Sequence, residues 1–158
     1  MGDCAGSPQF THVSFGDCRV VLDNLAGGGR TTRGRLIPYC LLTAPELAYV
    51  GMHESDARAK NVSYRIARPP MALVLRTRTL SQTRGFIKAL IGADDRILSF
   101  TVLGAEASEV MAVVRTAMLG DMPYTVLRDA IFTHPTAAEG LITLFASPPS
   151  ARWPKQSG

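Results

Sequence analysis

The sequence contains no long apolar segment, no paired cysteines and few aromatic residues. No apolar run approaches the ~20 residues that a helix needs to cross a bilayer, so we expect no membrane-spanning helix. The three cysteines, Cys4, Cys18 and Cys40, are too far apart for a Cys-x-x-Cys pair or a zinc-ligand spacing. The three histidines are equally scattered, so we expect no metal site.

The first residues also lack the features of a secretory signal. Met1-Gly2-Asp3-Cys4 carries no basic residue and leads into no apolar core. We therefore expect a cytosolic (cytoplasmic) chain whose cysteines stay as free thiols.

Charge gives no strong indication of a nucleic-acid partner. The chain has 17 Lys and Arg against 13 Asp and Glu, a net charge of +4. Its densest basic cluster, Arg76, Arg78 and Arg84, is expected to be a solvated, partly ion-paired strand face. Aromatic residues make up only 7% of the chain, whereas a nucleic-acid surface usually interleaves aromatics with a tighter basic patch. We expect no nucleic-acid binding, and a duplex-binding assay at low salt would test this.

What is present supports a folded domain with a substantial core. Hydrophobic residues make up 46% of the 158 residues. The clearest strands are predicted over 85–91 and 96–103, because both are apolar and Gly92-Ala93-Asp94-Asp95 between them is a hairpin turn signal. The clearest helix is predicted over 105–119, with Glu106 in its first turn. Its apolar stripe is Val110, Val113, Val114 and Ala117, which we interpret as core or dimer seam.

The remaining elements complete an α+β fold with an antiparallel sheet and helices packed on one face. Further strands are predicted over 37–42, 47–52 and 63–67, with 71–78 continuing the last, and further helices over 7–25, 54–60, 123–132 and 136–145. Glycines 27–29 end the first helix. We expect three parts: 1–35 with one helix but no parent sheet, a main domain over 36–147, and a flexible tail over 148–158.

One segment has the residues of a proton-transfer site. His134-Pro135-Thr136 is followed by Glu139 where a helix is expected to begin. An imidazole, with an ordinary pKa of about 6.5, can accept and donate protons near neutral pH. A carboxylate can hold one ring nitrogen and stabilise the imidazolium. The alternative is a histidine that only caps or packs a helix start.

Four blocks in order resemble one family, the FAD-dependent pyridine nucleotide-disulfide oxidoreductases, which includes dihydrolipoamide dehydrogenase and glutathione reductase. The chain is similar to their C-terminal dimerisation domain. The blocks are Thr43-Ala44-Pro45-Glu46-Leu47-Ala48-Tyr49-Val50-Gly51; Gly85-Phe86-Ile87-Lys88; Arg96-Ile97-Leu98 with Gly104, Ala107 and Glu109; and His134-Pro135-Thr136 with Glu139.

The resemblance extends to the first 35 residues. Gly2-Asp3 resembles the end of the family's FAD-binding domain, where the aspartate binds the flavin ribityl chain, so Asp3 is the candidate cofactor residue. A helix beginning near residues 10–12 would aim its N-terminus at the flavin. A surface-turn role for Asp3 is the alternative. The family's Gly-x-Gly-x-x-Gly turn and redox-active Cys-x-x-x-x-Cys do not occur here.

The resemblance implies a dimerisation domain that presents His134 and Glu139 to the redox disulfide of the partner subunit. It implies a homodimer, with FAD and NAD(P) bound in the full-length enzyme. Because the cofactor motifs are missing, we expect a truncated chain that binds no cofactor and is not catalytically competent alone. The alternative is a stand-alone interaction module that dimerises with a full-length homologue and regulates it.

Overall fold

The computed structural model describes residues 2–146 and 151–153, and the chain divides into two compact units, Met1–Ile37 and Pro38–Gly158. The first unit holds a short 3-10 turn, η1 (Asp3–Ala5), and one long helix, α1 (Thr11–Leu25). The helix begins four residues later than its apolar spacing predicts, and within residues 10–12 as the family resemblance implies. Its apolar residues Phe15, Leu22 and Leu25 are exposed, so this unit by itself leaves much of its apolar surface uncovered.

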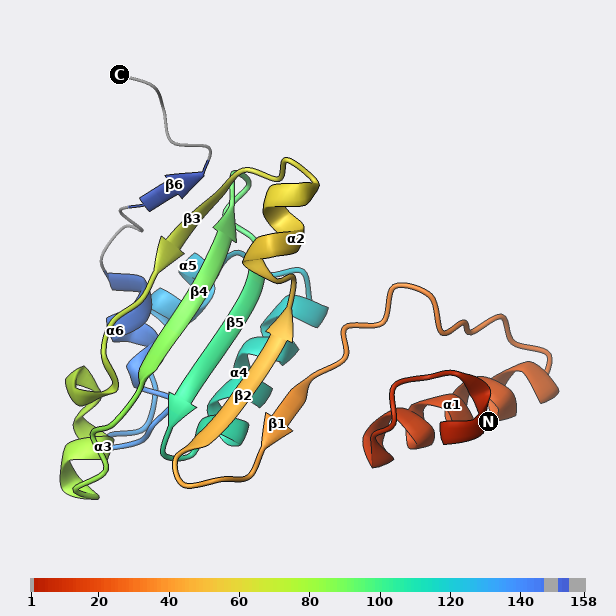
Figure 1. The fold of residues 1–158 in the computed structure, drawn as a ribbon, viewed down its shortest axis with the longest axis horizontal. Coiled ribbons are helices and arrows are strands. Elements are labelled where there is room, and N and C mark those ends of the chain that lie inside the picture. Colours follow the sequence, from red (N-terminus) through yellow and green to blue (C-terminus); the bar gives the residue numbers. More distant parts are fainter. Residues whose placement is uncertain (1, 147–150, 154–158) are drawn as a thin grey trace. The chain divides into compact units, whose positions relative to one another are not determined.

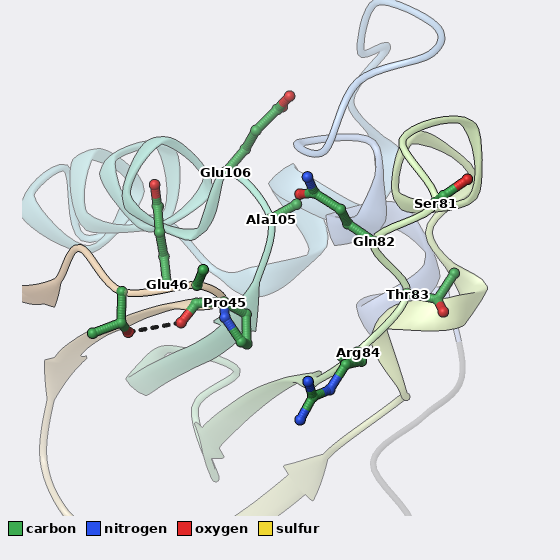
Figure 2. A pocket seen from close by; sticks show the side chains of 10 residues that line it. Pro45, Glu46, Ser81, Gln82, Thr83, Arg84, Ala105 and Glu106 are labelled. Atoms are coloured by element: carbon green, nitrogen blue, oxygen red, sulfur yellow. Dashed lines mark hydrogen bonds between the residues drawn. The ribbon is translucent and has the colours of Figure 1, made fainter.

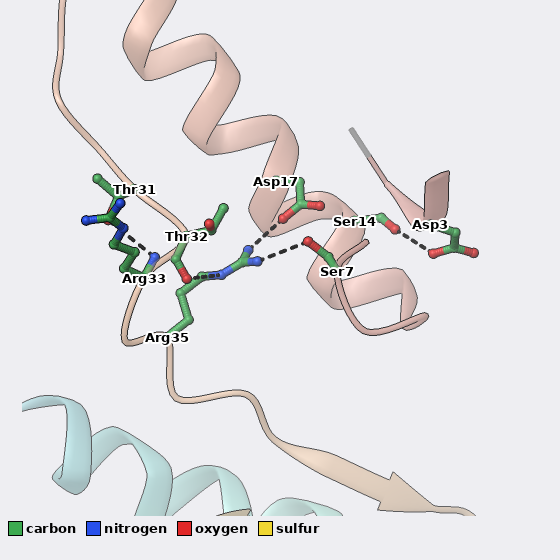
Figure 3. Close-up of polar contacts among 8 residues, drawn as sticks. All are labelled: Asp3, Ser7, Ser14, Asp17, Thr31, Thr32, Arg33 and Arg35. Carbon is green, nitrogen blue, oxygen red and sulfur yellow. Dashed lines mark hydrogen bonds and ion pairs between the residues drawn. The ribbon is translucent and has the colours of Figure 1, made fainter. Parts of the chain in front are cut away.

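One arginine ties the first unit together (Figure 3). Arg35 donates to the buried Asp17 carboxylate of α1 at 2.7 Å, to Ser7 at 3.4 Å and to the Thr32 carbonyl at 3.2 Å. This guanidinium holds the pKa of the Asp17 carboxyl below its ordinary value. Gly16 leaves room for it, since a Cβ there would lie 3.2 Å from Arg35 Nη1.

The second unit is built on a sheet of six strands in the order β1-β2-β5-β4-β3-β6, with every neighbouring pair antiparallel. The strands are β1 (Tyr39–Leu41), β2 (Glu46–Gly51), β3 (Tyr64–Ala67), β4 (Phe86–Gly92), β5 (Ile97–Gly104) and β6 (Ala151–Trp153). The helices are α2 (Glu54–Ala59), α3 (Leu75–Thr79), α4 (Ala107–Leu119), α5 (Tyr124–Asp129) and α6 (Gly140–Ala146), with a 3-10 turn η2 (Met71–Leu73).

The predicted α+β class is confirmed. Helices α4, α5 and α6 cover one face of the sheet, and α2 lies over one end of the other face (Figure 1). Fully buried side chains fill the space between the sheet and the three helices. Among the largest of these are Ile87, Phe100, Val102, Val110, Val114, Leu141, Leu144 and Phe145. On the opposite face a smaller cluster joins Ala57 of α2 to Tyr64 and Leu90.

Gly51, the last residue of the Thr43–Gly51 block, is required by the pairing of β2 with β5. Gly51 pairs with Ser99 of β5 and has φ +101°, a conformation that L side chains rarely adopt. A Cβ at this position would lie 2.3 Å from the Leu98 carbonyl oxygen. The need for glycine at this position therefore comes from the close approach of the β2 and β5 backbones.

One predicted strand is wrong. The strand predicted over 71–78 is instead η2 followed by α3, in which Met71, Val74 and Thr77 are buried at a spacing of three residues. The Thr77 hydroxyl lies 2.8 Å from both the Met71 and Val74 carbonyls and stabilises these turns. The cluster of Arg76 and Arg78 consequently lies on a helix and not on a strand face.

Helices near the carboxyl end are shorter than predicted. α5 ends at Asp129 and α6 begins only at Gly140, so residues 130–139 form a connecting loop. In the predicted tail, Ala151–Trp153 pair with β3, and the rest of that prediction lies outside the described residues.

Candidate functional site

His134 and Glu139 meet at the end of the loop between α5 and α6. His134 Nδ1 lies 2.9 Å from Glu139 Oε1 and 3.0 Å from Oε2. The histidine side chain is 60% exposed, whereas the carboxylate is 30% exposed. Within the described part of the chain, Nε2 of this ring makes no hydrogen bond. The pair therefore has one ring nitrogen held by a carboxylate and the other available to an incoming group.

The Thr136 hydroxyl links two backbone groups, one just before His134 and the other at Glu139. Its hydroxyl donates to the Thr133 carbonyl at 2.8 Å and accepts the Glu139 amide at 3.3 Å. Thr136-x-x-Glu139 is a capping-box sequence, in which the carboxylate would return to the threonine amide. Here the carboxylate binds His134 instead. The peptide bond between His134 and Pro135 is cis.

A hollow of about 190 Å³ adjoins the pair. Its lining is Leu73, Val74, Leu75, His134, Glu139, Gly140, Ile142 and Thr143. Leu73 and Leu75 are 59% and 40% exposed, so the surface next to the histidine is apolar. These leucines were not predicted as neighbours of the site, because residues 71–78 were expected to form a strand.

A larger hollow of about 380 Å³ lies elsewhere, between the loop that opens β2 and the segments before β4 and α4 (Figure 2). It does not include His134 or Glu139. Glu46, in the Thr43–Gly51 block, accepts hydrogen bonds from the Ser108 amide at 3.0 Å and its hydroxyl at 2.9 Å. A carboxylate from β2 thereby caps the start of α4.

Glu106 was predicted to lie in the first turn of this helix, but it lies one residue before the helix begins. Glu106 precedes α4 with φ +57°, and its carboxylate pairs with Arg76 Nε at 3.3 Å. The predicted stripe of α4 is largely confirmed as core, since Val110, Val114 and Ala117 are buried.

Asp3, the candidate flavin residue, lies in the first unit and is exposed (Figure 3). Its Oδ1 accepts a hydrogen bond from Ser14 of α1 at 3.2 Å. Helix α1 begins at Thr11, within the predicted interval of residues 10–12. Asp3 alone does not form a cofactor site, because no glycine-rich turn that could hold a pyrophosphate accompanies it. The residues present therefore do not fit FAD by themselves.

No group of three His, Cys, Asp or Glu side chains in residues 2–146 and 151–153 is placed to hold a metal ion. No helix in this part of the chain has the length and apolarity to cross a membrane.

Comparison with known sequences places the second unit in one family. The family model described as the dimerisation domain of pyridine nucleotide-disulphide oxidoreductases matches residues 37–145. The chain is 37% identical over 149 residues to the probable pyridine nucleotide-disulfide oxidoreductase RclA of Escherichia coli, covering 92% of this chain and 34% of that protein. It is 30% identical to dihydrolipoyl dehydrogenase 2 of Haloarcula marismortui, covering 89% of this chain and 30% of that protein.

Solved structures agree with this assignment. The HOCl-induced flavoprotein disulfide reductase RclA from Escherichia coli superposes with a TM-score of 0.88 at 38% identity, over 92% of this chain and 34% of that one. LpdA from Mycobacterium tuberculosis has a TM-score of 0.83 at 22% identity, over 90% of this chain and 32% of that one, which shows a shared fold. The chain thus spans about a third of the length of these relatives. It belongs to the pyridine nucleotide-disulphide oxidoreductase family, through that family's dimerisation domain.

Proposed function

We propose that this chain is the dimerisation part of a cytosolic flavoenzyme that transfers electrons between NAD(P)H and a disulfide. In the assembled homodimer, His134 and Glu139 move protons at the redox disulfide of the partner subunit. The observation that carries the proposal is the bidentate approach of the Glu139 carboxylate to Nδ1, with the rest of an exposed ring turned to solvent.

The proposed step is a proton transfer coupled to thiol–disulfide exchange. A thiolate, not a thiol, attacks a disulfide, so each exchange releases a proton from one sulfur and returns one to another. Nε2 of His134 accepts the thiol proton, and the ring becomes an imidazolium. The Glu139 carboxylate keeps Nδ1 as the donor and stabilises the positive charge. When the thiolate leaving group departs, Nε2 gives the proton back.

The cofactors belong to the full-length enzyme. In that context Asp3 would offer FAD a hydrogen-bond acceptor and the start of α1 a helix N-terminus, and the bound cofactor would supply two-electron chemistry. The described residues do not hold it alone. We therefore propose that this chain by itself is not catalytically competent.

Exposed apolar residues support self-association. Leu119, Met122, Val126 and Ile131, between 41% and 101% exposed, follow one another from the end of α4 past α5. Exposed apolar side chains gathered in one region of a chain commonly mark a protein interface. A dimer seam here would adjoin the loop that carries His134, which begins directly after α5.

A chimaera tests the proposed chemistry. This chain would replace the matching third of Escherichia coli RclA, and NAD(P)H-dependent reduction of a low-molecular-weight disulfide would be measured. His134→Gln should lower kcat by ~10²–10⁴-fold, the usual contribution of a general acid–base. Glu139→Gln should lower it by ~10-fold, because the imidazolium loses its charged partner but the ring keeps a hydrogen-bond acceptor.

His53→Gln is the matched control. His53 is also an exposed histidine of the second unit, but it stacks on Tyr49 at 4.3 Å and lies outside the site. Its replacement should leave kcat within about twofold, as for surface substitutions elsewhere. A His134→Gln chimaera that binds flavin and reduces disulfide at the unsubstituted rate would contradict the proposal.

A further inference from the structure

Gly140, the first residue of α6, occupies a position where an added side chain would force its neighbours to move. It is buried, and an added Cβ would lie 2.7 Å from Val74 Cγ2, 3.1 Å from Val74 Cγ1 and 3.2 Å from Ile87 Cδ1. Contacts below about 3.0 Å are not tolerated without movement of one partner. Val74 and Ile87 are themselves fully packed, with 2% and 0% exposure, so they have little room to yield.

Backbone conformation does not call for glycine here. Gly140 is not among the glycines with positive φ, so alanine could adopt its backbone geometry. In a helix, alanine is favoured over glycine by about 1 kcal/mol. What glycine provides at this position is therefore space, which lets α6 approach β4 and the turn before α3 closely.

The depth of that approach sets the place of Glu139. Glu139 is bonded directly to Gly140, its amide donates to Thr136, and its carbonyl accepts from Ile142 at 3.1 Å. The Gly140 amide donates to Ala137 at 3.0 Å, which ties the same turn. If the start of α6 moves outward, the Glu139 backbone must move with it. A shift of half an ångström or more would take the 2.9–3.0 Å contacts with His134 to the limit of a hydrogen bond.

We propose that Gly140 is a positioning residue, whose missing side chain seats α6 on Val74 and Ile87 at the depth that holds Glu139 against His134 Nδ1. This inference rests on the proposed function for its meaning in catalysis. The proposed link between the packing of Gly140 and the hydrogen bond of the His134 ring can be measured in the chain without cofactor or partner.

The test is which ring nitrogen of His134 carries the proton when the ring is neutral. This is read from nitrogen–proton correlation spectra of protein labelled in its histidine rings. The chain has only three histidines, so substitution assigns each ring. In the native chain, Glu139 should hold His134 as the Nδ1–H tautomer. Glu139→Ala removes the acceptor and should increase the Nε2–H form. Gly140→Ala should move the spectrum most of the way towards that of Glu139→Ala.

A compensating substitution separates positioning from general damage. Val74→Ala removes both methyl groups that the new Cβ would meet, so the double variant Gly140→Ala/Val74→Ala should recover the native His134 spectrum. If Gly140→Ala alone does not fold, the double variant still tests the inference. A native His134 spectrum in the double variant supports it, and a spectrum like that of Glu139→Ala overturns it.

Gly120→Ala is the matched control, since a Cβ there meets the mobile end of Met122 at 3.1 Å and Gly120 has φ −80°. It should leave the His134 ring unchanged. If Gly140→Ala keeps the native ring spectrum while Glu139→Ala alters it, the positioning inference falls and the proposed function stands. If Glu139→Ala has no effect on the ring, the pair does not form in solution and both are overturned.

Discussion

Ile131→Asp is expected to abolish self-association while leaving the fold intact. Ile131 is 101% exposed and follows α5, next to the loop that carries His134. Because it packs against none of the residues that the structure describes, its replacement should change the free energy of unfolding of the monomer by no more than about 0.5 kcal/mol. An apolar side chain so exposed is best explained by a partner that covers it.

The magnitude follows from symmetry. Burying an isoleucine side chain contributes ~1.5–3 kcal/mol. A two-fold dimer contains the residue twice, so full burial of both copies would contribute up to ~3–6 kcal/mol. Since 1.4 kcal/mol corresponds to a tenfold change in a dissociation constant, the substitution should weaken the dimer by ~10²-fold or more. Two buried aspartates would add a desolvation cost to this loss.

Sedimentation equilibrium over a range of protein concentrations measures the dissociation constant directly. Leu42→Asp is the control, because Leu42 is 78% exposed but lies in the turn between β1 and β2. It should weaken the dimer far less. A native chain that stays monomeric at high micromolar concentration, or an Ile131→Asp variant as dimeric as the native chain, would refute this reasoning.

Three further outcomes are expected. Lys88, which donates to Glu54 at 2.9 Å, holds the pKa of the Glu54 carboxyl below its ordinary value of 4.5. The pair therefore stabilises the fold above that value, and this stabilisation is lost as pH falls through the lowered pKa. In the Lys88→Met variant, the free energy of unfolding measured in urea at a series of pH values should fall less steeply on the acid side. Gly51→Ala should destabilise the fold by ~2 kcal/mol or more in urea, because of the φ of +101° and the contact with the Leu98 carbonyl. Arg35→Met should speed amide hydrogen exchange in α1 and leave β4 and β5 unchanged.

The central hairpin and the long helix could be predicted because their signals are local. β4 and β5 are apolar runs joined by a glycine- and aspartate-rich turn, and α4 repeats its apolar residues at helical spacing. Such patterns depend little on the rest of the chain. The order of the strands was not predicted, because it depends on pairing between segments that lie far apart in the sequence.

The segment over 71–78 shows where local pattern fails. Met71-Ala72-Leu73-Val74-Leu75 is a short apolar run, and such runs suit a strand or a buried helical turn equally. Its helical form is fixed by contacts with distant residues, including the approach of Gly140 to Val74. The same holds for the start of α4, which is capped by Glu46 from another strand.

The two residues of the candidate site and the contact between them were predicted, whereas the loop that carries them was not. The spacing of His134 and Glu139 is visible in the sequence, whereas their contact depends on a loop that is not helical and on the Thr136 hydroxyl. A Thr-x-x-Glu sequence would by itself predict a capping box. The structure instead bears out the predicted contact between the Glu139 carboxylate and the His134 ring.

Mixed dimers test most directly the claim that this pair acts across a subunit boundary. One RclA chimaera would carry His134→Gln with its redox disulfide intact, and the other would keep His134 but have its redox cysteines replaced by serine. Each alone should be nearly inactive. After dissociation and random reassociation, half of the dimers should contain one chain of each kind. Each mixed dimer has one working site of its two, so activity should recover to roughly a quarter of that of the unsubstituted dimer. Reassociated dimers that contain both chains and show no recovered activity would contradict the account.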